Sequence, residues 1–232
     1  MKKNAAFSLI ELLVVIAIIA VLTSLAVPVF QRIMERAHAI KDGSNLKQIG
    51  IGTVAYLNDN NEVLFSTSTT QPDAAGNMLC APGLLQLQYV QTALVFRSDF
   101  DRRADRSKPP AIMSYGVNTN ILNRPAQPAG PSDFDGNWTK LTAPSQLIYM
   151  APNIDVSQAS TVAFLPLDAG TPTVLAVPTP AKTHADYRGT HYSRSQMTVL
   201  YADGHIASIP YKDFANSTAT DDDQRRWKPI YP

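Results

Sequence analysis

The pattern of hydrophobic and polar positions divides the chain into a long apolar segment, an amphipathic segment and a mixed remainder. From Phe7 to Val29 there are 23 residues, and Glu11 is the only charged one among them. Because an α-helix rises about 1.5 Å per residue, this segment is long enough to cross a hydrocarbon core of roughly 30 Å. We therefore expect a membrane-spanning N-terminal helix.

Beyond Pro28 the apolar positions recur at helical spacing, which extends the predicted helix over residues 30–58. The apolar stripes of this half consist of Ile33, Ala37 and Ile40, then Leu46, Ile49, Thr53 and Leu57. Residues 42–45 interrupt the period, either as a break capped by Ser44 or as a weak point that costs about 1 kcal/mol at Gly43. We favour a mostly continuous helix that ends near Asn58, because the Asn and Asp residues at 58–61 form a strong stop signal. The first half of the helix is expected in a membrane or filament core, and the second half is expected to pack its stripe against the head.

Residues 59–232 are rich in turn-forming residues and contain short β-type runs, including 146–150 and 161–165. The clearest signal is a hairpin with strands at 197–202 and 205–209, joined by Asp203 and Gly204. Asp-Gly between two β-prone runs favours a type I′ turn, in which both central residues have positive φ. Asp203 and Gly204 are therefore interpreted as turn residues, not as part of a catalytic site.

Composition narrows the function. Lys and Arg number 20 against 19 Asp and Glu, so the chain offers no basic surface for nucleic acid. Cys80 is the only cysteine, which excludes a disulfide within the chain. The sequence has no glycine-rich phosphate loop, paired-cysteine zinc pattern or serine-nucleophile elbow. We therefore expect no catalytic residues, no enzymatic activity and no cofactor.

Two groups of residues invite a metal hypothesis. His191, Asp203 and His205 are acceptable zinc ligands, but their spacing does not force them together, so we assign no metal to them. The acidic run at 221–223 supplies the oxygen ligands that calcium prefers. Three consecutive acids in an extended segment point to alternate sides, so a plain acidic tail is the simpler interpretation and calcium stays an open alternative.

Glu11 separates three interpretations of the N-terminal segment. A secretory signal peptide would be cut after Ala26, and a plain signal anchor would not be cut at all. Neither explains a carboxylate that costs about 1–3 kcal/mol within a membrane. In the third interpretation the chain is cut before Phe7, which creates an α-amine four residues from Glu11. That amine can pair with the carboxylate, within one helix or between staggered neighbouring subunits.

At these residues the segment resembles the leader of type IV prepilins and type II secretion pseudopilins. Their pattern is a short basic leader ending in Gly, then Phe-Thr-Leu-Ile-Glu and an apolar helix with a kinking proline. Ala6 and Ser8 replace the usual Gly and Thr, whereas the residues that match are Phe7, Leu9, Ile10, Glu11 and Pro28. The resemblance implies cleavage between Ala6 and Phe7 by a prepilin peptidase and methylation of Phe7. It also implies filament assembly through Phe7, Glu11 and Pro28.

Further matches point to a subgroup of these proteins. Residues 45–50 with Tyr56 resemble its second helical half, and residues 114–118 resemble its central Tyr-Gly-x-Asn segment. The subgroup carries a C-terminal His-spacer-Asp-Gly motif with nine residues in the spacer. Here eleven residues separate His191 from Asp203, which is followed by Gly204 and His205. Either the hairpin is longer than in the subgroup or His191 is not the equivalent residue.

The resemblance implies a pilin-like α+β fold, in which a kinked, partly transmembrane helix packs on a small antiparallel β head. The expected segments are a leader at 1–6, a transmembrane helix at 7–29, an amphipathic half at 30–58 and the head at 59–232. The implied function is that of a structural subunit of a type IV pilus or type II secretion pseudopilus. The expected partners are a prepilin peptidase, other pilin or pseudopilin subunits and an inner-membrane assembly platform.

The basic residues Lys2 and Lys3 precede the apolar segment, and no basic residue follows until Arg32. This asymmetry places the N-terminus in the cytoplasm and exports the head, so we expect a single-pass inner-membrane protein. The alternative is a secreted enzyme or carbohydrate-binding module behind an ordinary signal peptide.

Overall fold

The computed structural model describes the helix and most of the head. The described residues are 9–65, 71–72, 78–79, 85, 88–90, 92–100, 114–121, 134–152, 174–175, 191–192, 195–215, 221–227 and 229–230. Ala6, Phe7, Cys80 and the predicted strand at 161–165 lie outside them.

The N-terminal helix α1 spans Leu9–Asp59, 51 residues, with Pro28 inside it. It continues through residues 42–45, so the prediction of a continuous helix is confirmed. It ends within one residue of the predicted stop, and the backbone then turns through positive φ at Asn61 (54°) and Glu62 (60°). The run of Asn and Asp therefore ends the helix as expected, because these residues favour turns over helix interiors.

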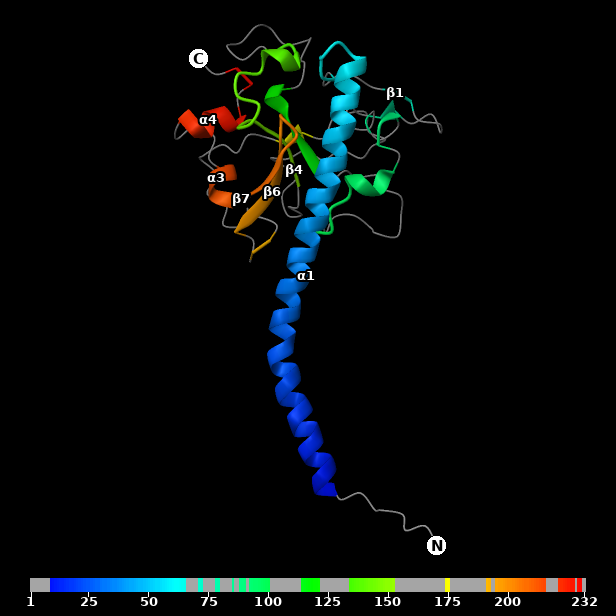
Figure 1. Cartoon of the computed structure of the whole chain (residues 1–232), viewed down its shortest axis with the longest axis vertical. Helices are drawn as coiled ribbons and strands as arrows, with labels where there is room; N and C mark the ends of the chain where they lie inside the picture. The colour runs from blue at the N-terminus through cyan, green and yellow to red at the C-terminus, as the bar shows by residue number, and fades with distance from the viewer. Residues whose placement is uncertain are drawn as a thin grey trace. The chain divides into compact units, whose positions relative to one another are not determined.

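The chain divides into two compact units, Met1–Ala37 and His38–Pro232, and α1 contributes to both. The second unit contains a five-stranded sheet with the order β5-β3-β4-β6-β7 (Figure 1). Its strands are β3 (Tyr115–Asn118), β4 (Ile148–Pro152), β5 (Val174–Leu175), β6 (Gln196–Tyr201) and β7 (Ile206–Pro210). The pairs β3–β4, β4–β6 and β6–β7 are antiparallel, whereas β5 runs parallel to β3. The predicted α+β class is confirmed.

Shorter elements complete the second unit. Strands β1 (Gln71–Pro72) and β2 (Met78–Leu79) form a separate antiparallel pair. The 3-10 helices are η1 (Ala93–Phe96), η2 (Thr119–Ile121) and η3 (Trp138–Lys140), and the short α-helices are α3 (Tyr211–Ala215) and α4 (Asp221–Trp227). The acidic run at 221–223 therefore begins a helix, and the predicted extended tail is wrong. Acidic residues in the first turn of a helix are favoured by its dipole.

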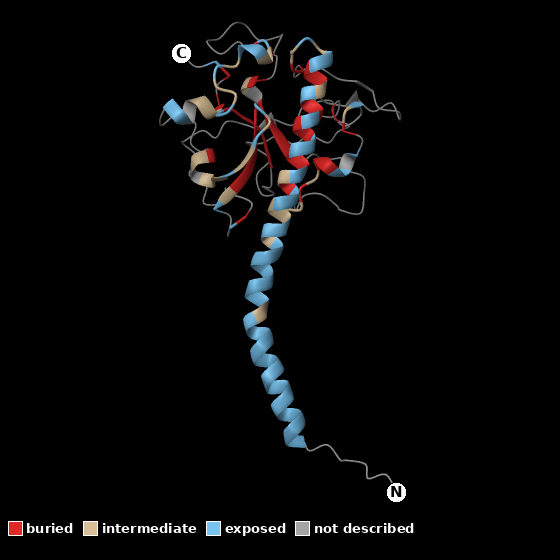
Figure 2. Ribbon diagram, viewed as in Figure 1, coloured by how far each residue is buried: buried red, intermediate tan, exposed pale blue. Residues whose placement is uncertain are grey.

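Both faces of the sheet are covered (Figure 2). In β6, Met197, Val199 and Tyr201 belong to a hydrophobic cluster that includes Phe214 of α3 and Trp227 of α4. Leu200 belongs to the opposite cluster, together with residues of α1. Since successive side chains of a strand point to opposite faces, burial on both faces requires the nearly continuous apolar run that the sequence shows here.

The second half of α1 packs on the sheet through the predicted stripe. Leu46, Ile49, Thr53 and Leu57 are all buried. Thr53 Oγ1 also lies 3.1 Å from the buried Tyr149 hydroxyl of β4. In contrast, Ile33, Ala37 and Ile40 of the first stripe are exposed. The sequence thus located the buried face of α1 correctly only from Leu46 onward.

Small residues allow the helix to approach its neighbours closely. A Cβ atom added to Gly52 would lie 2.6 Å from Val90 Cγ2, and one added to Gly50 would lie 3.3 Å from Leu200 Cδ1. Such distances are shorter than ordinary van der Waals contacts, so a larger residue would push the helix away from its neighbours. These glycines therefore lower helix propensity but permit close packing of α1.

The predicted strand at 146–150 is displaced by two residues to become β4. The amides of Gln146 and Leu147 both bind the carbonyl of Ala143, which holds them in a turn. The strand can begin only after this turn, at Ile148. The predicted hairpin is confirmed in β6 and β7, which pair from Gln196 with Pro210 to Leu200 with Ile206.

Candidate functional site

The N-terminal half of α1 presents an apolar surface. Its large hydrophobic side chains are exposed, from Leu9 (81% exposed) to Met34 (53%). Among the described residues, α1 is a helix long and apolar enough to cross a membrane. Length and composition alone would suit a membrane anchor or a signal sequence, so the choice between them depends on the residues at the start of the helix.

Glu11 lies in the first turn of α1 with its side chain exposed. A carboxylate at this place interacts favourably with the helix dipole, by about 0.3–1 kcal/mol. The predicted cleavage site at Ala6 and Phe7 lies outside the described residues, so the pairing of Glu11 with the Phe7 α-amine stays a prediction. Pro28 lies inside the helix, where it has no N–H to donate to the carbonyl four residues earlier.

A buried polar cluster joins the second half of α1 to the head, and sequence reasoning did not find it. Asp42 is 0% exposed. Its Oδ1 accepts a hydrogen bond from the Tyr115 hydroxyl at 2.9 Å, and its Oδ2 accepts one from the Ser98 hydroxyl at 2.8 Å. Asn45, one turn further along, donates to the Tyr115 hydroxyl at 3.1 Å and to the Arg97 carbonyl at 3.0 Å. The helix is thereby bound to both residues 97–98 and strand β3.

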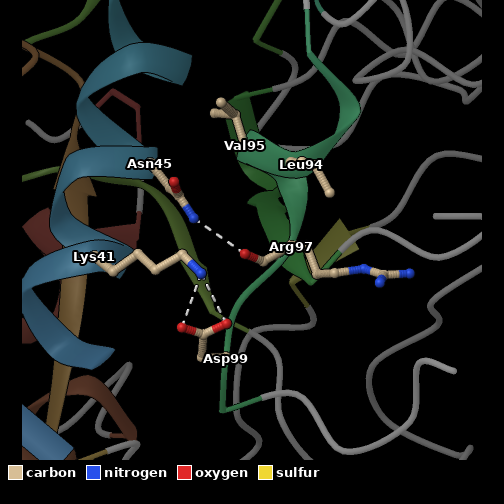
Figure 3. A pocket seen from close by; sticks show the side chains of 6 residues that line it. All are labelled: Lys41, Asn45, Leu94, Val95, Arg97 and Asp99. Atoms are coloured by element: carbon tan, nitrogen blue, oxygen red, sulfur yellow. Dashed lines mark hydrogen bonds and ion pairs between the residues drawn. The ribbon is translucent and has the colours of Figure 1, made fainter. Parts of the chain in front are cut away.

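Next to this cluster, Asp99 forms ion pairs with two residues of α1. Lys41 Nζ lies 3.0 Å from each oxygen of Asp99, and His38 Nδ1 lies 3.0 Å from Oδ2. Figure 3 shows Lys41 reaching Asp99 and Asn45 reaching the backbone at Arg97. Partial burial raises the pKa of Asp99, but the hydrogen bonds and charges of Lys41 and His38 outweigh burial and lower that pKa overall. Asp99 is therefore stabilised as a carboxylate.

The environment of Asp42 has the opposite effect. Burial raises the pKa of Asp42 from 3.8 to about 6, although the hydrogen bonds from Ser98 and Tyr115 partly oppose this shift. Burial and the nearby Asp42 charge also raise the pKa of Tyr115 well above its usual 10. The two neighbouring acids thus differ because one is paired with cations and the other is bound by hydroxyl groups in a desolvated site.

The sequence contains a signal for this cluster. Asp42 precedes Leu46 by four residues and Ile49 by seven, so it shares the buried face of the helix. An acidic residue on that face requires hydrogen-bonding partners from the head. The sequence interpretation treated residues 42–45 as an interruption, whereas Asp42 and Asn45 are buried contacts of a continuous helix.

A small pocket of about 190 Å³ lies beside the cluster (Figure 3). It is lined by Lys41, Asn45, Leu94, Val95, Arg97 and Asp99. Lys41 and Asp99 bind one another, and Asn45 binds the Arg97 carbonyl. These pairs already satisfy one another, so they do not identify a ligand for the pocket.

The residues considered as zinc ligands are separated by the hairpin. His191 pairs with Gln196 at the start of β6, whereas Asp203 and His205 lie in the turn after its end. His191 is buried, with Nε2 2.7 Å from Ser208 Oγ. In the part of the chain that the structure describes, no three His, Cys, Asp or Glu residues are placed to hold a metal ion together. The His191 side chain therefore contacts β7 through Ser208.

At the turn, His205 is oriented by its neighbours. Its Nδ1 lies 2.6 Å from Asp203 Oδ1, and its ring stacks on Tyr201 with centroids 4.2 Å apart. Lys47 of α1 donates to the Gly204 carbonyl at 3.1 Å. Residues 45–50 and the hairpin turn, which both resemble the prepilin subgroup in sequence, are therefore in direct contact.

The geometry of this turn differs from the prediction. Gly204 has φ of 85°, but Asp203 is not among the described residues with positive φ, which excludes a type I′ turn. The Gly204 amide binds the Tyr201 carbonyl, and the Tyr201 amide binds the His205 carbonyl. These bonds define a loop longer than the two residues predicted, in which the glycine after the turn has a left-handed conformation. Asp203 instead accepts a hydrogen bond from the His205 amide, so its side chain and not its φ supports the turn.

Replacing Gly204 with valine should destabilise the head by about 1–2 kcal/mol, because a β-branched residue resists positive φ. A Cβ at this position would meet nothing within 4 Å, so a steric clash would not contribute. Asp203→Asn is the matched control and should be nearly neutral, since the amide oxygen can also accept from His205. Urea unfolding of the full chain in detergent measures both changes. Equal stability of Gly204→Val and the parent would contradict the turn geometry.

Comparison with known proteins adds evidence at the N-terminus. Residues 1–27 match the family described as the prokaryotic N-terminal methylation motif. No significant match was found among curated proteins or solved structures. The match covers Ala6, Phe7, Glu11 and the apolar half of α1, and it does not extend to the C-terminal hairpin. The proposed C-terminal subgroup is therefore supported only by the resemblance in sequence.

Proposed function

We propose that this chain is a prepilin-like precursor, which is processed by a prepilin peptidase and assembled into a filament. The filament is a type IV pilus or a type II secretion pseudopilus. The observation that carries the proposal is the methylation motif at residues 1–27, continuous with an apolar helix whose side chains are exposed. The same motif and helix indicate a membrane-anchored protein.

The proposed mechanism is assembly, not catalysis. The peptidase removes residues 1–6, and the new α-amine of Phe7 becomes available for methylation and for pairing with Glu11. Apolar helices exposed in the single chain then pack against those of other pilin or pseudopilin subunits, which removes their surface from lipid or water. The inner-membrane assembly platform adds subunits with their heads exported. This role requires no cofactor.

The alternative is a secreted enzyme or carbohydrate-binding module behind an ordinary signal peptide. In that case cleavage would follow Ala26, and the mature chain would begin at Val27. Two observations favour the prepilin interpretation. Helix α1 passes without interruption through residues 24–27 and on into the head, and the matching family is defined by the segment that a signal peptidase would remove.

The mass of the mature N-terminus tests the proposal. When the chain is produced together with a prepilin peptidase, we expect a product that begins at Phe7. Ala6→Gly should be processed at least as well, whereas Ala6→Leu should accumulate the precursor, because the residue before the cut must be small. A mature chain that begins at Val27 would support the alternative. Equal processing of the parent and both variants would remove Ala6 and Phe7 from consideration as the cleavage site.

A further inference from the structure

The Asp42 cluster and the Asp99 ion pairs form a reciprocal link between α1 and the segment 97–100. Ser98 of the segment donates to Asp42 of the helix, and Asp99 of the segment accepts from Lys41 and His38 of the helix. We call this set the polar staple, which consists of His38, Lys41, Asp42, Ser98, Asp99 and Tyr115. Two consecutive residues of the segment, Ser98 and Asp99, thus bind side chains on one turn of α1.

Phe100 of the segment makes further contacts with α1 and with His191. Phe100 adds an edge contact with the His38 ring at 5.7 Å between centroids and a stacked contact with His191 at 6.4 Å. Its amide also donates to Ser98 Oγ at 3.2 Å, so the position of Phe100 is coupled to the hydrogen bond between Ser98 and Asp42. A change at Asp42 is therefore transmitted directly to residues 98–100.

A charge on Asp42 destabilises the polar staple. The groups that face it are His38 and Lys41 on α1, Asp99 on the segment and Tyr115 on β3. Lys41 and His38 are already engaged with Asp99, whose own negative charge disfavours a second carboxylate nearby. When Asp42 carries a proton, the cost of burying a charge disappears, and the Ser98 hydroxyl can rotate to accept from the carboxyl group.

We propose that the polar staple is a pH-dependent contact, which holds segment 97–100 against α1 while Asp42 is protonated and loosens when Asp42 ionises. Ionised Asp42 gains hydration when the segment moves away, and the strands of the sheet need not separate for this to happen. The polar staple lies within the unit His38–Pro232, so this pH dependence does not require assembly into a filament. Acidic surroundings therefore favour the closed arrangement.

The direction of the pH effect follows from linkage. The pKa of Asp42 is about 6 in the closed arrangement, and an open, hydrated carboxyl returns toward 3.8. Between these values the closed state binds more protons than the open state, so opening increases by up to about tenfold per pH unit. We expect the opening constant to rise by about thirtyfold from pH 4 to pH 6 and to level off above about pH 7. The lowered pKa of Asp99 keeps this carboxylate ionised through the window, so its ion pair with Lys41 persists.

Hydrogen exchange of the full chain in detergent micelles measures this opening. The amides of residues 96–100 are followed from pH 4 to pH 7.5, with rates normalised to those of the unfolded sequence at each pH. Protection in this segment should fall with rising pH, whereas protection of the β6–β7 hairpin should change much less. Uniform protection of the segment across this range would overturn the proposal.

Three variants identify the group responsible. Asp42→Asn should abolish the pH dependence, because it keeps an acceptor but cannot ionise. Tyr115→Phe removes a donor that stabilises the carboxylate, so the plateau should move to higher pH. Asp203→Asn, a similar change outside the staple, should behave like the parent. If Asp42→Asn or Tyr115→Phe keeps the parental profile, another group titrates and the proposal is wrong. If Asp42→Asn fails to fold, the Tyr115→Phe shift decides alone.

Discussion

Replacing Glu11 with leucine should leave membrane insertion and leader removal intact but reduce incorporation into filaments by at least about tenfold. This expectation rests on the proposed function. In the separate subunit the carboxylate is a cost, since a charged group within a membrane is disfavoured by about 1–3 kcal/mol even on lenient scales. The cost is recovered when a subunit enters the filament and Glu11 meets the Phe7 α-amine. A tenfold loss corresponds to about 1.4 kcal/mol.

The position of Glu11 in the first turn of α1 offers a competing explanation. A carboxylate there stabilises the helix through its dipole, by about 0.3–1 kcal/mol, and this effect needs no filament. The pairing with Phe7 depends more strongly on distance, because buried ion pairs overcome desolvation only with close geometry. Glu11→Asp, shorter by one methylene, should therefore assemble to an intermediate extent, whereas a dipole role would be retained by Asp.

Insertion, leader removal and filament incorporation must be measured separately in the parent, Glu11→Leu and Glu11→Asp. A defect in Glu11→Leu confined to the last step supports pairing in the filament. A defect already present at insertion points to the helix itself. Normal incorporation of Glu11→Leu would show that the carboxylate does not serve this pairing.

The long helix was predictable because its signals are local. An apolar run of 23 residues, a helical stripe at 46–57 and an Asn-rich stop do not depend on the rest of the fold. The exposed first stripe shows the limit of this reasoning. Ile33, Ala37 and Ile40 follow the same period as the buried stripe, but periodicity states only that residues share a face, not what covers that face.

The buried polar cluster was missed because its partners are far apart in sequence. Asp42 meets Ser98 after 56 residues and Tyr115 after 73, and no local pattern links these positions. The resemblance had marked residues 45–50 and 114–118 separately. The structure shows that Asn45 and Tyr115 bind each other, which gives a physical reason for both segments.

The turn at Asp203 and Gly204 was located correctly but given the wrong geometry. A dipeptide signal predicts where a chain reverses, whereas the turn type depends on which residues of the two strands pair. Here the last ladder pair is Leu200 with Ile206, which leaves a loop longer than two residues. Glycine is still needed, at one position with positive φ and not as half of a pair.

The last prediction concerns Asn118, the final residue of β3 and of the segment 114–118 that resembles the prepilin subgroup in sequence. This side chain is 1% exposed. Its Nδ2 donates to the Ile148 carbonyl at 2.9 Å and to the Trp227 carbonyl at 3.2 Å, and its Oδ1 accepts from the Asn120 amide at 3.0 Å. One amide group thus binds the backbone of β4, α4 and its own following turn, three elements that periodicity alone does not connect.

Asn118→Ala should lower the free energy of unfolding by about 2–4 kcal/mol, because it leaves buried backbone groups without their partner. Asn120→Ala is the matched control. Its side chain is partly exposed and donates to the same Trp227 carbonyl at 3.0 Å, which would keep its bond from Asn118, so the loss should be below about 1 kcal/mol. Urea unfolding of the full chain in detergent, followed by tryptophan fluorescence, compares the two, since the buried Trp227 reports on this region. Equal effects of the two substitutions would show that Asn118 does not hold these elements together.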